Sequence, residues 1–69
     1  MDASKTYLIV GLGLLGGKYA QTLSGKGFTV TGIDCNPDTI RYALEKAYIS
    51  AGATEQFEDL VRQADVIIF

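Results

Sequence analysis

The sequence predicts an α/β fold in which helices cover both faces of a parallel sheet with strand order 3-2-1-4. A glycine-rich turn, Gly11-x-Gly13-x-x-Gly16, lies between an apolar run and a helical stretch, and a second apolar run then ends in Asp34. Beyond Asp34 the strand and helix patterns continue to alternate, giving the order βαβα(β)αβ. This alternation predicts parallel strands joined by right-handed crossovers.

The first three elements surround the glycine-rich turn. Residues 6–10 (TYLIV) form an apolar run that predicts a strand. Residues 14 to about 25 predict a helix that ends at two nearby glycines. Its large apolar residues recur every four positions: Leu15, Tyr19 and Leu23. The β-branched residues of 28–33 predict the second strand.

The second helix has a well-marked start. Asn36 is a favoured N-cap residue, Pro37 suits the first helical position, and Asp38 complements the helix dipole. The residues expected to be buried follow helical spacing: Ile40, Ala43, Leu44 and Ala47. A short third strand is expected over 48–50, ahead of Gly52.

The last two elements are a third helix and a fourth strand. Thr54 is expected to cap the helix, whose apolar residues repeat the same spacing: Phe57, Leu60, Val61 and Ala64. The run Val66-Ile67-Ile68-Phe69 is typical of a central parallel strand, which has a neighbour on each side. We therefore expect residues 1–69 to be the N-terminal portion of a longer domain, cut after its fourth strand. Alone, the chain is expected to self-associate through this strand.

The three glycines of the turn have separate physical roles. Gly11 permits a tight turn out of the first strand, Gly13 lets the backbone approach a pyrophosphate, and Gly16 lets the helix lie close to the strand. The amides of Gly13, Leu14 and Leu15 have no intrahelical partner and lie at the positive end of the helix dipole. A phosphate group fits there. The sequence thus predicts a dinucleotide-binding half-fold, that is, a partial Rossmann fold.

Asp34 ends the second strand, where it is expected to accept hydrogen bonds from the adenosine ribose hydroxyls. Its carboxylate would repel a 2′-phosphate, and neither Cys35 nor Asn36 supplies a cation. NAD is therefore the expected cofactor. Arg41 on the next helix leaves NADP as an alternative, and a turn or capping role for Asp34 is also open.

Other glycine loops fit the sequence less well. The phosphate loop of nucleotide triphosphatases needs G-x-x-x-x-G-K-[ST], but Leu12 stands at its first glycine and Tyr19 replaces its hydroxyl residue. Methyltransferases that use S-adenosylmethionine usually carry G-x-G-x-G, and Leu15 occupies the last of those glycine positions. Glycines that merely turn the chain are the remaining alternative.

Composition excludes several classes of function. A net charge of −2 provides no basic patch for nucleic acid or anionic lipid. The single cysteine, Cys35, cannot form an internal disulfide, and no His/Cys cluster offers a metal site. The start lacks the apolar core of a signal peptide, and every apolar run is too short to span a membrane. We expect a cytoplasmic protein.

The sequence offers no catalytic residue. It contains no histidine, and the acids within the motif have binding roles. Hydride-transfer enzymes of this architecture hold the substrate over the nicotinamide, beyond the fourth strand. We therefore expect this chain to bind half of a cofactor and to be inactive by itself.

Three segments, IVGLGLLGGKYAQTL, VTGIDCNPDTIRYALEKAYI and ADVIIF, resemble the N-terminus of the prephenate dehydrogenase family, which includes arogenate dehydrogenases. The resemblance extends over residues 8–69. Its more particular element is the double glycine Gly16-Gly17 after two leucines. Lys18 departs from the family, which commonly has a serine there, near the pyrophosphate.

The resemblance implies that the whole protein oxidatively decarboxylates prephenate to 4-hydroxyphenylpyruvate with NAD(P), in tyrosine biosynthesis. It implies cofactor contacts at Gly11, Gly13, Leu14, Leu15, Gly16 and Asp34. The family's catalytic histidine, its substrate-binding arginine and the helical C-terminal domain that builds its homodimer have no counterpart in residues 1–69. Two alternatives share the motifs: a regulatory nucleotide-sensing module without turnover, and another β-hydroxyacid-type dehydrogenase.

Overall fold

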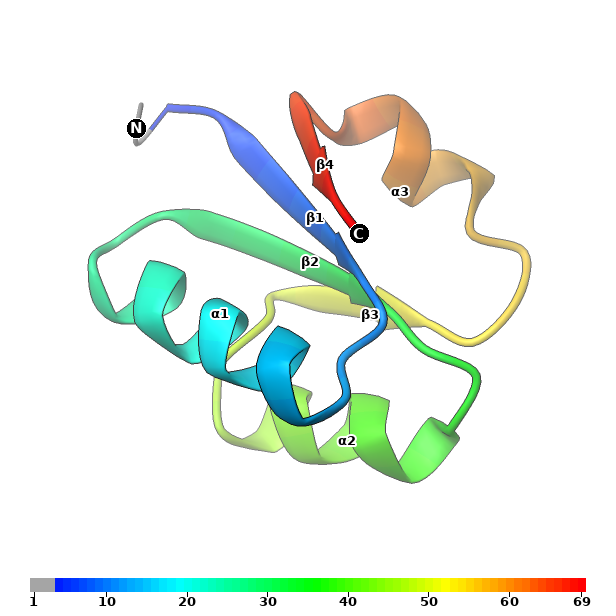
Figure 1. Cartoon of the computed structure of the whole chain (residues 1–69). Helices are drawn as coiled ribbons and strands as arrows, with labels where there is room; N and C mark the ends of the chain where they lie inside the picture. The colour runs from blue at the N-terminus through cyan, green and yellow to red at the C-terminus, as the bar shows by residue number, and fades with distance from the viewer. Residues whose placement is uncertain (1–3) are drawn as a thin grey trace.

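The computed structural model describes residues 4–69 and contains one parallel sheet (Figure 1). Its strands are β1 (Thr6–Val10), β2 (Thr29–Ile33), β3 (Ala51–Ala53) and β4 (Val66–Ile68), in the order β3-β2-β1-β4. Leu8 of β1 lies opposite Thr31 of β2 on one side and Ile67 of β4 on the other. The predicted strand order is confirmed.

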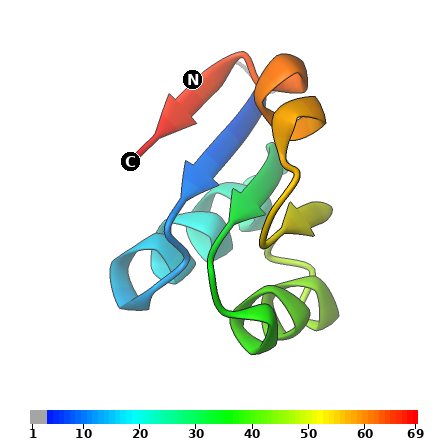
Figure 2. The ribbon, with the colours of Figure 1, turned by 90° about the vertical axis from the view of Figure 1, so that its right-hand side faces the viewer.

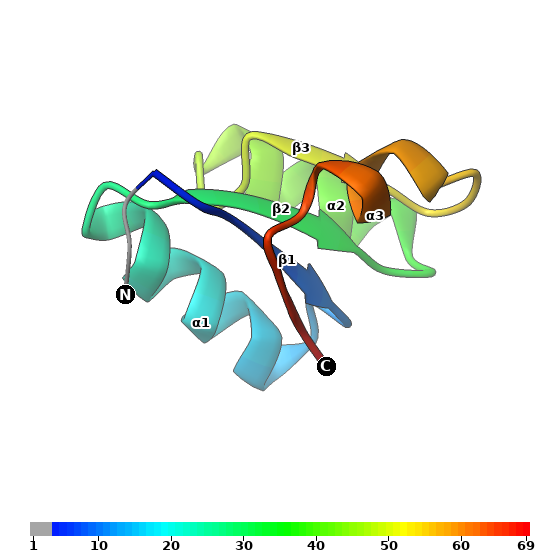
Figure 3. The same cartoon turned by 90° about the horizontal axis from the view of Figure 1, so that it is seen from above.

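Helices cover both faces of the sheet, as expected. The helices α1 (Leu14–Gly25) and α2 (Pro37–Glu45) lie together on one face, and the short α3 (Glu58–Gln63) lies on the other (Figure 2). In Figure 3, which looks down from above, α3 is nearer to the viewer and α2 lies behind β2 and β3. Each crossover between consecutive strands of the chain therefore contains a helix, as parallel strands require.

The core lies between the sheet and the α1–α2 layer. Strand alternation places Tyr7 and Ile9 of β1 on this face, and both are almost fully buried. They belong to one buried apolar cluster: Tyr7, Ile9, Leu12, Ala20, Leu23, Val30, Ile40, Ala43 and Ile49. Tyr7 also packs edge-on against Phe28, with ring centroids 5.5 Å apart. The α1–α2 layer therefore accounts for most of the apolar burial.

The first turn of α1 lies against the end of β1. A Cβ atom built on Gly16 would be 2.0 Å from the carbonyl oxygen of Gly11 and 3.5 Å from the Cγ2 atom of Ile9. Any side chain at position 16 would therefore force α1 away from the strand. The predicted role of Gly16 in close helix–strand packing is confirmed by this geometry.

The apolar spacing of the first two helices predicts burial only in part. Leu23 is buried, but Leu15 and Tyr19 are 78% and 58% exposed, because the packed face of α1 runs through Gly16, Ala20 and Leu23 instead. In α2, Ile40 and Ala43 are buried, as expected. The other two predicted positions, Leu44 and Ala47, are exposed.

Two expected boundaries are wrong. Residues 48–50 are not the third strand, because the amides of Tyr48 and Ile49 bond the carbonyl of Ala43 and close the turn that follows α2. The strand β3 begins at Ala51. Likewise Thr54 does not cap α3: Gln56 has a φ of 53°, in the left-handed region, so the helix begins only after Phe57.

Substitutions at the neighbouring glycines of α1 test the close helix–strand contact. Gly16→Ala should lower the free energy of unfolding by about 3 kcal/mol, because the new methyl group meets the Gly11 carbonyl. Gly17→Ala is the matched control. Its Cβ would lie 3.8 Å from the Leu12 carbonyl oxygen, so the better helix former should stabilise the chain by up to about 1 kcal/mol. Urea unfolding of both variants measures the difference, and equal stabilities would contradict the packing role.

Candidate functional site

The glycine-rich loop connects the carboxyl end of β1 to the start of α1. Gly11 has a φ of +89°, which side-chain-bearing residues rarely adopt, and its amide donates a 2.7 Å hydrogen bond to the carbonyl of Ile33. Gly13 is the N-cap residue of α1, and its carbonyl accepts the first helical hydrogen bond, from the amide of Gly17 at 2.8 Å. The loop is thus a tight turn fixed to both strands at its base, as the motif predicts.

The N-terminus of α1 is open and has the geometry that suits an anion. The amides of Leu14, Leu15 and Gly16 precede the first helical hydrogen bond, and no side chain caps them. The first turn contains no acidic residue that would offset the positive end of the helix dipole from within the helix. A Cβ built on Gly13 would meet nothing within 4 Å. Space therefore exists beside the loop where a phosphate group can approach the backbone.

Asp34 lies beside this loop, at the carboxyl end of β2. Its Oδ2 atom accepts a 2.8 Å hydrogen bond from the Leu12 amide, and its Oδ1 atom accepts one of 2.9 Å from the Asn36 amide. A carboxylate offers about four acceptor positions, so two remain for the hydroxyls of a ribose. The side chain is half-buried, which leaves those positions accessible.

Sequence reasoning missed two residues that shape the loop. The Leu12 side chain is only 4% exposed and lies over Gly32 of β2. A Cβ on Gly32 would be 2.4 Å from the Cδ1 atom of Leu12, so glycine is required beneath this leucine. A glycine inside a β-branched strand was the signal that could have found this contact, since such a glycine often marks a close approach.

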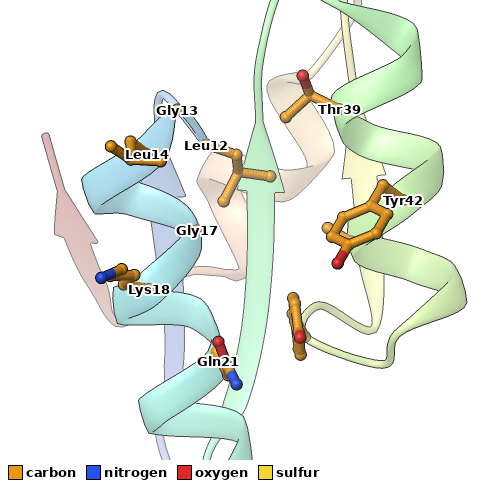
Figure 4. Close-up of a pocket in the computed structure, with 10 residues that line it drawn as sticks. Leu12, Gly13, Leu14, Gly17, Lys18, Gln21, Thr39 and Tyr42 are labelled. Atoms are coloured by element: carbon orange, nitrogen blue, oxygen red, sulfur yellow. The ribbon is translucent and has the colours of Figure 1, made fainter.

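A groove of about 390 Å³ opens between α1 and α2, next to the loop (Figure 4). In Figure 4 the side chains of Leu12, Thr39 and Tyr42 lie between the two helices, while Lys18 and Gln21 lie along α1. The groove touches Gly13 and Leu14, and neither Gly16 nor Asp34 lines it. It is therefore adjacent to the predicted phosphate and ribose positions rather than centred on them.

The structure brings together all six predicted cofactor-binding residues. Gly11, Gly13, Leu14, Leu15 and Gly16 form the loop and the first helical turn, and Asp34 is hydrogen-bonded to the loop at Leu12. Arg41, the cation that leaves NADP as an alternative, forms an exposed ion pair with Asp38 on its own helix. Cys35 is exposed and has a free thiol.

Two classes of site are not found within the described part of the chain. Residues 4–69 contain no group of three histidine, cysteine or acidic side chains placed to hold a metal ion. None of the helices described there has the length and apolar character needed to cross a membrane.

The comparison with protein families supports this interpretation of the loop. The family model for the NAD-binding domain of 6-phosphogluconate dehydrogenase matches residues 6–69. The chain belongs to this family. NAD is accordingly the cofactor of the domain, and the predicted Rossmann-type nucleotide-binding fold is confirmed. Comparison with curated protein sequences gives no match.

Solved structures include similar chains. The crystal structure of prephenate dehydrogenase from A. aeolicus, in complex with hydroxyphenyl propionate and NAD+, is 30% identical, with a TM-score of 0.78. The match covers 91% of this chain and 23% of that one. The resemblance to prephenate dehydrogenases found in the motifs is thus confirmed at the level of the structure.

A second similar structure shows the fold alone. It is myo-inositol 2-dehydrogenase from Lactobacillus plantarum, which is 19% identical, with a TM-score of 0.72. The match covers 94% of this chain and 21% of that one. The chain therefore spans less than a quarter of either structure.

Gly13 can be tested separately from folding. Gly13→Ala should weaken NAD binding about tenfold, because its Cβ enters the space through which the pyrophosphate approaches the backbone. The stability loss should stay within about 1 kcal/mol, the usual range for an N-cap change. Gly25→Ala is the matched control, since its Cβ also meets nothing within 4 Å but lies at the far end of α1. Calorimetric titration with NAD that gave equal affinities for both variants would contradict the assignment.

Proposed function

We propose that this chain is the N-terminal nucleotide-binding portion of an NAD-dependent dehydrogenase that resembles prephenate dehydrogenase. The observation that carries the proposal is the joint placement of an uncapped helix N-terminus and the Asp34 carboxylate around one glycine loop. The first can hold the pyrophosphate and the second the adenosine ribose. In this proposal Gly11, Gly13 and Gly16 shape the loop, and the amides of Leu14 and Leu15 contact the phosphates.

The reaction of the whole protein is proposed from the similarity to the prephenate dehydrogenase structure. That reaction is the oxidative decarboxylation of prephenate to 4-hydroxyphenylpyruvate, a cytoplasmic step of tyrosine biosynthesis with prephenate or arogenate as the small-molecule substrate. The catalytic residues and a helical dimerisation domain would lie outside residues 1–69. The chain alone is then expected to bind the adenosine half of NAD weakly and to catalyse nothing.

A second candidate is another β-hydroxyacid-type dehydrogenase. The family model favours it, because that model describes the domain of 6-phosphogluconate dehydrogenase. Both candidates use the same cofactor half-site, so the chain's own residues do not separate them. Turnover assays of the full-length protein with prephenate, arogenate and 3-hydroxy acids distinguish the two.

The carboxylate of Asp34 should make NAD the better ligand. It accepts hydrogen bonds from a free 2′-hydroxyl and repels a 2′-phosphate, and Arg41 is paired with Asp38. Calorimetry should therefore show NAD binding at least about tenfold more tightly than NADP, because the juxtaposition of like charges costs binding free energy. In Asp34→Ser the preference for NAD over NADP should become smaller, because the repulsion of the 2′-phosphate is lost with the carboxylate. Tighter NADP binding by the unmodified chain would refute this role and would point to Arg41 as a phosphate ligand.

Self-association through β4 is a further part of the proposal. The strand pairs with β1 on one side only, and Ile67 and Phe69 are 39% and 95% exposed. Unpaired apolar edges recruit other strands. Light scattering should show a mass that rises with concentration, and Ile67→Lys should keep the chain monomeric. If the unmodified chain stayed monomeric at high concentration, and its mass equalled that of the 69-residue sequence, this expectation would be contradicted.

A further inference from the structure

We propose that Asp34 is also a positioning residue for the phosphate-binding amides, holding the glycine loop in its binding shape before any cofactor arrives. The inference rests on the proposed dinucleotide site and adds a second role to the carboxylate. In this role Asp34 acts through Leu12, the residue between the first two glycines of the loop.

Leu12 is fixed by two independent contacts. Its side chain is buried over Gly32, and its amide donates to the Oδ2 atom of Asp34 at 2.8 Å. The side-chain contact sets the position of the residue, and the contact of the Gly11 carbonyl with Gly16 restricts the other end of the same peptide. The carboxylate is the partner that holds the N–H end of this peptide, and the next peptide leads directly to Gly13, the N-cap of α1. The orientation of the phosphate-binding amides therefore depends on the Leu12–Asp34 hydrogen bond.

The same carboxylate connects both sides of the nucleotide site. Its Oδ1 atom accepts from the amide of Asn36, whose own side chain accepts from the Asp38 amide and caps α2. Hydrogen bonds to a charged acceptor are roughly twice as strong as neutral ones. Asp34 thus ties the loop before α1 to the loop before α2. Without it, the half-buried Leu12 amide would lose its acceptor.

A positioning role and a ribose-binding role predict opposite effects on an anion that has no ribose. If Asp34 only binds ribose hydroxyls, its negative charge repels inorganic pyrophosphate, and removing the charge should tighten binding. If Asp34 holds the loop, removing its acceptor should loosen the amides and weaken binding. Pyrophosphate therefore separates the two roles.

Two neutral variants isolate the hydrogen bond from the charge. Asp34→Asn keeps an oxygen that can accept from the Leu12 amide, whereas Asp34→Ala has none. Titration with pyrophosphate, followed by amide NMR of the 69-residue chain, should show Asp34→Ala binding about fivefold more weakly than Asp34→Asn. Asp38→Ala is the charge control, since Asp38 is exposed and does not contact the glycine loop. This control should bind pyrophosphate at least as tightly as the unmodified chain.

Hydrogen exchange gives a second readout that requires no ligand. In the unmodified chain the Leu12 amide should exchange slowly, as amides inside β1 do, and in Asp34→Ala it should exchange at least about tenfold faster while core amides stay unchanged. Should Asp34→Ala fail to fold, slow exchange at Leu12 in the unmodified chain and in Asp34→Asn still supports the proposal. Fast exchange there overturns it.

The outcomes also separate this inference from the proposed function. Equal pyrophosphate affinities for Asp34→Ala and Asp34→Asn, in a chain that still binds NAD, would overturn the positioning role and leave the proposed function standing. If the unmodified chain bound neither NAD nor pyrophosphate, the proposed function would be overturned. The positioning role of Asp34, which depends on that function, would then be overturned as well.

Discussion

The contact between Gly16 and the carbonyl oxygen of Gly11 sets the geometry on which the rest of the site depends. Because the Cβ position of Gly16 lies only 2.0 Å from that oxygen, α1 can meet β1 this closely only without a side chain there. The close contact aims the N-terminus of α1 across the carboxyl edge of the sheet. It also brings the buried part of α1, Ala20 and Leu23, onto the core. The absence of a side chain at position 16 is therefore required both for the packing of α1 and for the position of its N-terminus, the proposed anion site.

The parallel topology supplies the second half of the site. Neighbouring parallel strands end at the same edge, so the loop after β1 and the loop after β2 lie side by side. This adjacency lets a single carboxylate, Asp34, contact the amides of Leu12 and Asn36 at once. An acid at the end of β2 therefore connects the two loops without any ligand, in addition to its proposed role at the ribose. The glycine at position 32 belongs to the same arrangement, since it accommodates the Leu12 side chain.

The sequence alone predicted those features that depend on the chemistry of a few neighbouring residues. The glycine spacing, the Asn36–Pro37 helix start and the acid after β2 each need a particular residue type, and the structure has all three as expected. It did not predict element boundaries that are set by hydrogen bonds within a turn or by an unusual backbone conformation. The amides of Tyr48 and Ile49 bond the carbonyl of Ala43 in the turn after α2, and the left-handed backbone of Gln56 delays the start of α3. The spacing of apolar residues reports neither feature.

The exposed apolar residues of α1 follow from the position of the helix in the sheet order. Strand order reverses between β1 and β4, which is the switch point where doubly wound sheets bind nucleotides. Leu15 and Tyr19 lie on this side and line a hollow of about 230 Å³ together with Ile68 and Phe69. The β2 side of the switch point contains Asp34, the proposed ribose acceptor. The side chains that line the hollow on the β4 side are apolar apart from the hydroxyl of Tyr19. Among the described residues, the groups proposed to bind the cofactor therefore gather on the adenosine side of the switch point.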